Sequence, residues 1–286
     1  MSRAERIGEA FKSACLAELT ALKPGNVHVF ADGHQLTRDQ FLRSADAATA
    51  PLAARGARVG RRILDAIAAT HLAVGTNTNL GIILLCAPLA AAAETVHADL
   101  RAALAAVLDD LDTADADLAF RAIVRAAPAG LGRVAENDVN APARVTLRDA
   151  MADAAERDRV ARQYVTVYAD IFEHGLPRLA AAAARGWAEE WAISAVYLGF
   201  LADFPDSHIV RKYGIATAEN VRKTAGEFLA RLPSAWDPSR LTDDLLAWDA
   251  ALKTNGINPG TSADLTVATL FARRLATILP FERNSG

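Results

Sequence analysis

The most apolar stretch of the chain reads LGIILLCAPLAAAA and covers residues 80–93. A helix that crosses a membrane needs roughly 20 apolar residues, and this stretch is shorter and contains Pro88. A helix that is apolar on all sides lies inside a larger fold. We therefore expect a buried central helix over about 79–96 and no membrane partner.

The rest of the chain shows helical spacing of apolar residues and no convincing strand alternation. Thr37 begins a capping-box pattern with Gln40, Thr146 is a second candidate cap, and Gly256 suits a helix C-terminus. The sequence predicts an all-α fold. Its expected helices cover residues 5–22, 37 onward, 60–71, 79–96, 98–110, 113–126, 146–175, 176–184, 187–202, 217–231, 238–254 and 261–279.

The longest break in the helical pattern covers residues 128–142 and could separate two domains. However, the central helix and the last helix are too apolar to be covered by either half alone. We therefore predict one all-helical domain over residues 1–286.

Composition and charge narrow the class of protein. The chain has 286 residues, 52% hydrophobic and 23% charged, with a net charge of -3, which is typical of an ordered globular protein. It has no basic block, so nucleic acid is not an expected partner. Cys15 and Cys86 lie in apolar helical patterns without metal spacing, and the charged N-terminus does not resemble a signal peptide. We expect a cytoplasmic protein, and a homodimer is compatible with so apolar a chain.

Three polar, glycine-containing turns lead into helices. Residues 255–265 read NGINPGTSADL, residues 23–28 read KPGNVH, and residues 75–81 read GTNTNLG. Pro fixes one backbone angle and Gly permits close approach of the backbone, while the amides at a helix start attract anions. The turns therefore suggest a phosphate-rich ligand. A fourth polar segment, DSHIVRKYG at residues 206–214, combines carboxylate, imidazole and cationic groups.

Taken in order, these segments resemble the triphosphoribosyl-dephospho-CoA synthase family over nearly the whole chain. The best markers are Lys-Pro-Gly at 23–25, Asn-Thr with Gly81 at 77–81, and Pro-Gly with Ala-Asp-Leu at 259–265. The resemblance implies an all-helical transferase that takes ATP and 3′-dephospho-CoA. A ribose hydroxyl of the acceptor attacks the anomeric carbon of the ATP ribose and displaces adenine, and the triphosphate stays in the product.

The chain departs from the family at one place. The classical segment reads Asn-Thr-His-Lys-Gly, whereas this chain has Asn79 and Leu80 where the His and Lys stand. It is more similar to a divergent branch found in archaea and methylotrophic bacteria. Two alternatives follow: the same ribosyl transfer to another acceptor in one-carbon cofactor biosynthesis, or a helical nucleotide-binding protein without turnover.

The implied reaction requires a group that deprotonates the hydroxyl, a group that protonates adenine, and Mg²⁺ with cations for the triphosphate. We expect Asp264 to be a metal ligand or base, or alternatively to cap its own helix through Thr261. Asp206 is the second expected metal ligand, or alternatively a helix N-cap. His28 is the candidate acid, although a lone loop histidine is often incidental. His208 is a further catalytic candidate, in a polar set that suits a polyanionic sugar.

Nucleotide and substrate contacts are expected from polar residues in the same segments. Lys23 is expected to contact phosphate, or otherwise to be a solvated lysine at a helix end, and Glu18 either faces the same cavity or lies on the surface. Asn77, Thr78 and Asn79 either bind the ligand or cap the central helix. The full set of expected binding residues is Lys23, Gly25, Asn26, Asn77, Thr78, Asn79, Gly81, Arg211, Lys212, Asn258, Gly260, Thr261 and Ser262. Asp138 and the charged run 157–159 are further candidates.

Overall fold

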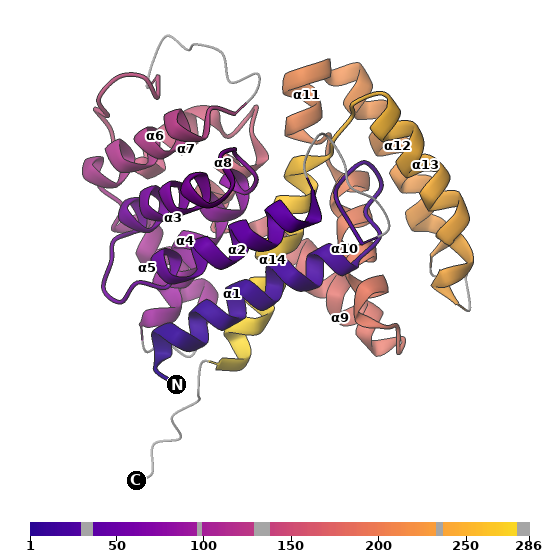
Figure 1. The fold of residues 1–286 in the computed structure, drawn as a ribbon, viewed down its shortest axis with the longest axis horizontal. Helices are drawn as coiled ribbons and strands as arrows, with labels where there is room; N and C mark the ends of the chain where they lie inside the picture. The colour runs from indigo at the N-terminus through magenta and orange to yellow at the C-terminus, as the bar shows by residue number, and fades with distance from the viewer. Residues whose placement is uncertain (30–36, 96–98, 129–137, 233–236, 279–286) are drawn as a thin grey trace.

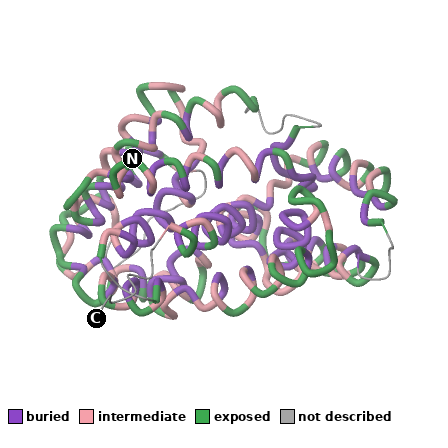
Figure 2. Tube along the Cα trace, turned by 90° about the horizontal axis from the view of Figure 1, so that it is seen from below, coloured by how far each residue is buried: buried purple, intermediate pink, exposed green. Residues whose placement is uncertain are grey.

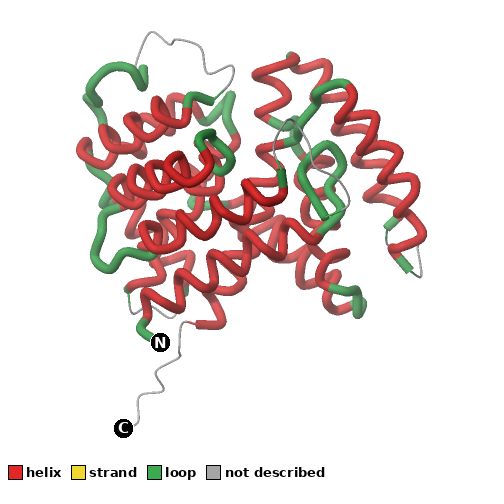
Figure 3. Tube along the Cα trace, viewed as in Figure 1, coloured by secondary structure: helices red, strands yellow, loops and turns green. Residues whose placement is uncertain are grey.

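The computed structural model describes residues 1–29, 37–95, 99–128, 138–232 and 237–278, and these residues contain helices and no strand (Figure 3). The predicted all-α fold is confirmed. The α-helices are α1 (Arg3–Thr20), α2 (Arg38–Leu52), α3 (Val59–Val74), α4 (Leu80–Glu94), α5 (Leu100–Asp109), α6 (Thr113–Ala126), α7 (Leu147–Ala154), α8 (Arg159–Thr166), α9 (Leu176–Ala184), α10 (Glu189–Asp203), α11 (Ser207–Tyr213), α12 (Ile215–Arg231), α13 (Thr242–Thr254) and α14 (Gly260–Ile278).

The apolar stretch forms α4 in the middle of the fold, as predicted. Almost every residue of α4 is buried, and α1, α2, α3, α5, α8 and α14 pack against it (Figure 1). Buried residues are concentrated in these central helices, while exposed residues lie on the outer ones (Figure 2). None of the described helices combines the length and hydropathy needed to span a bilayer.

Pro88 removes one backbone donor inside α4, and a tyrosine compensates for it. A proline cannot donate to the carbonyl four residues earlier, which here belongs to Leu84. The hydroxyl of Tyr164 donates to that carbonyl at 2.6 Å, and the hydroxyl of Tyr168 donates to the next one, on Leu85, at 2.9 Å. Since a buried carbonyl without a partner is costly, the two tyrosines fix α8 and the segment after it against α4.

Helix α10 separates the main hydrophobic cluster from a smaller one. Ile193 and Phe200 pack in the main cluster, whereas Leu198 and Leu201 pack in the smaller cluster with residues of α12 and α13. The two clusters therefore share α10 as a common wall. The single-domain organisation stays a prediction, which this shared helix supports.

The helix predicted over 146–175 was wrong as one element. The chain forms α7, α8 and a π-helical turn, Asp170–Gly175, instead. Asp158 interrupts the run because its carboxylate accepts the amides of Val160 and Ala161 and caps α8. The backbone then takes positive φ angles at Val167 and Tyr168. The expected helices did not include α11, which followed only from the alternative role of Asp206 as a helix N-cap. The start of α12 was placed slightly late.

Helix caps were predicted well where the signal was local. Thr37 and Gln40 form the expected capping box at the start of α2. Thr146 accepts the amide of Asp149 and caps α7. Gly256 has a φ of 68° just after α13, as expected for a glycine at a helix C-terminus.

Candidate active site

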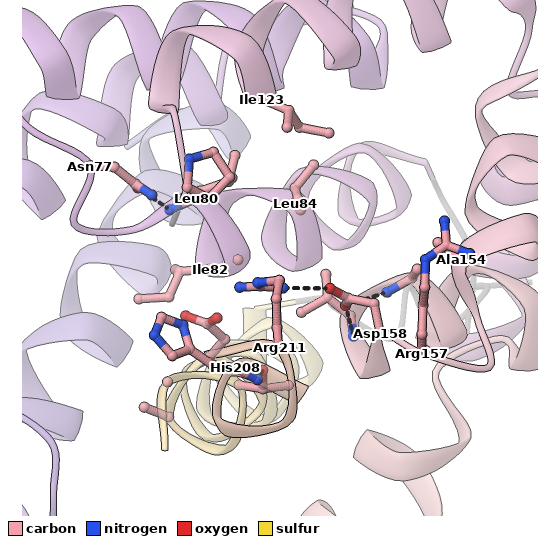
Figure 4. A pocket seen from close by; sticks show the side chains of 18 of the residues that line it. Asn77, Leu80, Ile82, Leu84, Ile123, Ala154, Arg157, Asp158, His208 and Arg211 are labelled. Atoms are coloured by element: carbon pink, nitrogen blue, oxygen red, sulfur yellow. Dashed lines mark hydrogen bonds and ion pairs between the residues drawn. The ribbon is translucent and has the colours of Figure 1, made fainter. Parts of the chain in front are cut away.

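A cavity of about 530 Å³ lies between α4, α6, α7, α8, α11 and the start of α14 (Figure 4). All four predicted polar segments contribute to its lining, although the 23–28 turn contributes only Asn26. Its polar lining residues are Glu18, Asn26, Asn77, Thr78, Asp138, Arg157, Asp158, His208, Arg211, Asn258, Thr261 and Asp264. Its apolar wall includes Phe41, Leu80, Ile82, Leu84, Phe120, Ile123, Val139, Met151 and Val160.

The turn at 258–264 brings Asp264 into the cavity on the first turn of α14. The alternative capping box with Thr261 does not form, because the Thr261 hydroxyl accepts the amide of His208 at 3.2 Å. Within the described ranges, no residue forms a hydrogen bond or ion pair with the Asp264 carboxyl group. Asp264 is therefore an uncommitted carboxyl group facing the cavity.

Helix α4 packs closely against this carboxyl group at Gly81. A Cβ atom at position 81 would lie 1.9 Å from Oδ2 of Asp264, so only glycine leaves room for the side chain as it stands. Burial, followed by the nearby carboxylates Asp206 and Glu18, raises the pKa of Asp264 well above its ordinary value. The group therefore retains its proton more readily than an exposed aspartate.

Asp206 has a different position from the one we predicted. Its carboxylate accepts the amides of His208 and Ile209 at the start of α11, and its other oxygen accepts the amide and the hydroxyl of Ser262. Asp206 is 3% exposed and does not line the cavity. The structure supports the alternative helix-cap role and not a ligand role. The amide of Ser262 in the first turn of α14 donates to the Asp206 carboxylate and not to a ligand. Ser262 is occupied by the same interaction and also lies off the cavity.

The segment at 207–213 contributes two cavity residues. His208 and Arg211 both point into the cavity from α11, and Arg211 donates to the carboxylate of Asp158 at 3.2 Å (Figure 4). Lys212 is exposed, lies over the ring of Tyr213 and does not line the cavity. The exposed Arg157 lines it as well. The predicted Lys212 contact is therefore not supported, and Arg157 is the better second cation.

The residues before α4 divide between the two roles that we considered. The side-chain oxygen of Asn77 accepts the amide of Leu80, and the hydroxyl of Thr78 donates to Ser44 at 2.6 Å, while both residues line the cavity. Asn79 is 5% exposed, donates to Thr70 and does not reach the cavity. Of the two departures from the family motif, only Leu80 therefore faces the site.

The two Pro-Gly turns pack directly against each other. Gly25 has a φ of 82°, and a Cβ atom there would lie 2.7 Å from Cδ of Pro259. The side-chain amide of Asn26 donates to Asn258 at 2.8 Å, and both asparagines line the cavity. The polar floor of the cavity is thus built jointly by residues far apart in the sequence.

Lys23 and His28 lie behind the residues that line the cavity and not among them. Lys23 is fully buried and pairs with Glu18, which does line the cavity. His28 is 1% exposed, and its Nε2 lies 3.2 Å from Oδ1 of Asp249. Neither Lys23 nor His28 lines the cavity. The interpretation of Lys23 as solvated was wrong, and the predicted substrate contacts of both residues are not supported.

The carboxylates do not form a preassembled metal site. Among the described residues, no cluster of three or more His, Cys, Asp or Glu side chains has the geometry to hold a metal ion. The oxygens of Asp206 are occupied, and Asp158 caps α8 and pairs with Arg211. The predicted resident site at Asp206 and Asp264 therefore does not fit the side chains present.

Sequence reasoning also missed the apolar wall of the cavity. Most of its residues come from α4, α6, α7 and α8, and these look like ordinary core positions in a helical pattern. No local signal distinguishes Ile123 or Met151 from a residue that packs in the core. Only the packing of the helices shows that these side chains enclose a space.

A helical protein with a deep, partly apolar cavity and a few convergent polar groups belongs to the class that binds small organic molecules. The comparisons with known proteins agree with this class. Residues 4–282 match the CitG family, ATP:dephospho-CoA triphosphoribosyl transferase, and the chain belongs to that family. It is thus a transferase that moves the triphosphoribosyl group of ATP to dephospho-CoA.

A solved structure shows the same fold. The chain is similar to a candidate triphosphoribosyl-dephospho-CoA synthase from Archaeoglobus fulgidus, with 23% sequence identity and a TM-score of 0.63. The match covers 81% of this chain and 96% of the archaeal chain. No curated protein sequence matches the chain.

Proposed function

We propose that the cavity is the place where the acceptor hydroxyl displaces adenine from ATP, and that Asp264 is the group that protonates the departing base. The observation that carries the proposal is the position of Asp264, a cavity carboxyl group without a hydrogen bond or ion pair among the described residues. A carboxyl group with a raised pKa holds its proton near neutral pH and can act as a general acid. Its environment favours this role over the base or metal ligand that we expected from the sequence.

The triphosphate requires cations, and Arg157 and Arg211 supply them at one side of the cavity (Figure 4). Guanidinium groups suit phosphate oxygens because they donate several hydrogen bonds from a planar fork. Arg211 already pairs with Asp158, so its side chain is held in place before the nucleotide arrives. His208 lies on the same helix and is placed to contact the ribose or the base.

We assign Mg²⁺ to the substrate rather than to the protein. Mg²⁺ keeps several waters and binds readily to phosphate oxygens, so it can enter as the MgATP complex. The chain then needs no preassembled cluster, in agreement with the arrangement of its described carboxylates. Asn26 and Asn258 are suited to hydrogen-bond the ribose hydroxyls or a base edge.

The apolar wall is suited to the uncharged parts of both substrates. Flat bases and the pantetheine arm of dephospho-CoA present apolar surface, which Phe41, Phe120 and Met151 can cover. Leu80 continues this wall at the position where the classical motif has a lysine. The departure therefore makes this part of the cavity wall more apolar without removing any of the groups assigned to the reaction.

The test is adenine release from MgATP with and without 3′-dephospho-CoA, with the products analysed by mass spectrometry. We expect adenine only when the acceptor is present, together with an adduct that has gained the triphosphoribosyl group. The alternative acceptor would be indicated if ATP bound and no adenine formed until another hydroxyl compound was supplied. ATP binding without turnover on any hydroxyl acceptor would leave only the non-catalytic alternative.

A further inference from the structure

Glu18 is a buried carboxylate that the proposed function leaves without a task. It lies in the last turn of α1, is 5% exposed and lines the cavity. Its Oε1 accepts from the ammonium of Lys23, which also lies 3.3 Å from the side-chain oxygen of Asn26. Glu18 therefore faces the cavity while its Oε1 is held by the ammonium of Lys23, which does not line the cavity.

The turn that carries Lys23 is fixed at three points. The hydroxyl of Ser194 donates to the carbonyl of Leu22 at 2.9 Å, and the hydroxyl of Tyr197 donates to the carbonyl of Pro24 at 2.7 Å. The amide of Gly25 donates to Asp249 at 2.8 Å. Lys23 itself is fully buried, so the ammonium is placed to orient Glu18 rather than to meet the substrate.

A buried ion pair is an expensive way to stabilise a fold, because both charges lose their hydration. The pair between Arg62 and Glu94 is also buried on its arginine side, but neither residue lines the cavity. The pair between Lys23 and Glu18 differs in that its carboxylate faces a space large enough for substrate. This position gives the carboxylate access to a reacting hydroxyl.

We propose that Glu18 is the catalytic base that takes the proton from the attacking hydroxyl of the acceptor, and that Lys23 is its positioning residue. This inference rests on the proposed function. The acceptor oxygen forms a bond to the anomeric carbon while the bond from that carbon to the adenine nitrogen breaks, and its electron pair leaves with adenine. The hydroxyl proton passes to Glu18, adenine takes a proton from Asp264, and solvent restores both carboxyl groups after release.

The surroundings of Glu18 suit this role. Burial raises its pKa, and the ammonium of Lys23 partly offsets the increase; a base works best when its pKa approaches the working pH. The other titratable groups coupled to Glu18 are Asp264 from α14, Tyr197 from α10 and Cys15 from its own helix. Lys23 is the only cation among these partners within the described part of the chain.

The first experiment removes the pair without leaving a buried charge. Breaking one side of such a pair destabilises a protein strongly, so the double variant Glu18→Gln/Lys23→Met is compared with Arg62→Met/Glu94→Gln, which removes a buried pair outside the cavity. We expect both double variants to fold and bind ATP. Adenine release should fall at least 100-fold in the first and less than five-fold in the second.

The second experiment separates orientation from general stability. In Lys23→Met, Glu18 loses its cation, so the acidic limb of the rate profile should move to higher pH while the KM for ATP changes little. A folded Glu18→Gln/Lys23→Met variant that retains activity would overturn the inference, as would an unshifted limb in Lys23→Met. If the wild-type protein itself releases no adenine with dephospho-CoA, the proposed function and this inference fail together.

Discussion

The two Pro-Gly turns share that residue pair and pack against each other, yet their polar side chains have different surroundings. The turn at 258–264 presents Asn258, Thr261 and Asp264 to the cavity. The turn at 23–28 presents only Asn26 there, while its lysine forms a buried ion pair with Glu18 and its histidine lies against the buried carboxylate of Asp249. The 258–264 turn therefore supplies a reacting group, and the 23–28 turn packs against it and supports it.

The difference follows from what each turn is packed against. After Pro259 and Gly260 the chain enters α14, whose first turn places Asp264 in the cavity and against Gly81 of α4. After Pro24 and Gly25 the chain is covered by α10 and by Asp249 from α13. A Pro-Gly turn thus indicates that backbones come close together. The elements packed around the turn determine whether its side chains face the cavity or other protein groups.

The largest effect is expected from Asp264→Asn. Loss of a general acid typically costs a factor of about 10²–10⁴ in rate, so adenine release should fall by at least 100-fold. If Asp264 is the acid, the wild-type rate should also decline as alkaline pH removes its proton, and steady-state assays across pH measure both effects. A variant with wild-type activity would remove Asp264 from the mechanism.

The same substitution should stabilise the fold at neutral pH. Because the folded pKa of Asp264 is raised, its contribution to stability is lost as pH rises from the unfolded value of about 3.9 towards the folded value. Asparagine does not ionise, so thermal melts should favour the variant at pH 8 and show a smaller difference at pH 4. A lower melting temperature for the variant at pH 8 would contradict the assignment.

Gly81→Ala should separate activity from stability at the 258–264 turn, because Gly81 packs against Asp264. The added methyl group meets the end of the Asp264 side chain, and alanine is about 1 kcal/mol better than glycine inside a helix. We expect at least a ten-fold loss of activity with little change in melting temperature. Gly226→Ala in α12 is the control, since its Cβ enters open space and both quantities should remain close to wild type or improve slightly.

Gly25→Ala should act mainly on stability. The methyl group would meet Pro259 and the carbonyl of Ile257, and it would be forced into a left-handed conformation that costs about 1–2 kcal/mol. Overpacking adds about 1–3 kcal/mol, so unfolding in urea should show a loss of several kcal/mol. Gly56→Ala has a similar φ of 70° and open space, and it should lose only the conformational part; equal losses would mean that the turns do not depend on their close contact.

The smallest effect is expected from His28→Gln. Burial lowers the pKa of His28, so the folded protein binds a proton there less readily than the unfolded chain does. The stability that follows is present above the unfolded pKa of about 6.5 and is lost as pH falls through that value. The variant should therefore show a flatter dependence of the free energy of unfolding on pH between 7 and 5, measured by urea titration; an unchanged slope would assign the effect to other groups.

The fold was largely readable from the sequence because its strongest signals are local. Apolar periodicity located α4 and α14, and capping residues located α2 and α7. The break at Asp158 was missed because capping signals and apolar periodicity do not distinguish an N-capping aspartate from a surface charge within a helix. The polar turns indicated which segments would converge, and Asp264, Asn77 and Arg211 all line one cavity; their role as a site stays a prediction.

The sequence did not allow a prediction of which polar side chains form contacts within the protein and which face the cavity. Asp206 and Asp264 are both carboxylates near glycine turns, and only the arrangement of α11 against α14 turns one into a cap and leaves the other uncommitted. For the same reason Lys23, which we expected to contact phosphate, pairs with Glu18 instead, whereas Arg157, which was only a further candidate, lines the cavity. Burial of these side chains depends on contacts between distant segments, which no local pattern encodes.

The most direct test compares adenine release from MgATP and dephospho-CoA by the wild-type protein, Asp264→Asn and His28→Gln in one assay. If the 258–264 turn supplies the reacting group and the 23–28 turn only supports it, Asp264→Asn should lose at least 100-fold in rate and His28→Gln should remain within about two-fold. The reverse order, with His28→Gln inactive and Asp264→Asn active, would contradict this division between the turns.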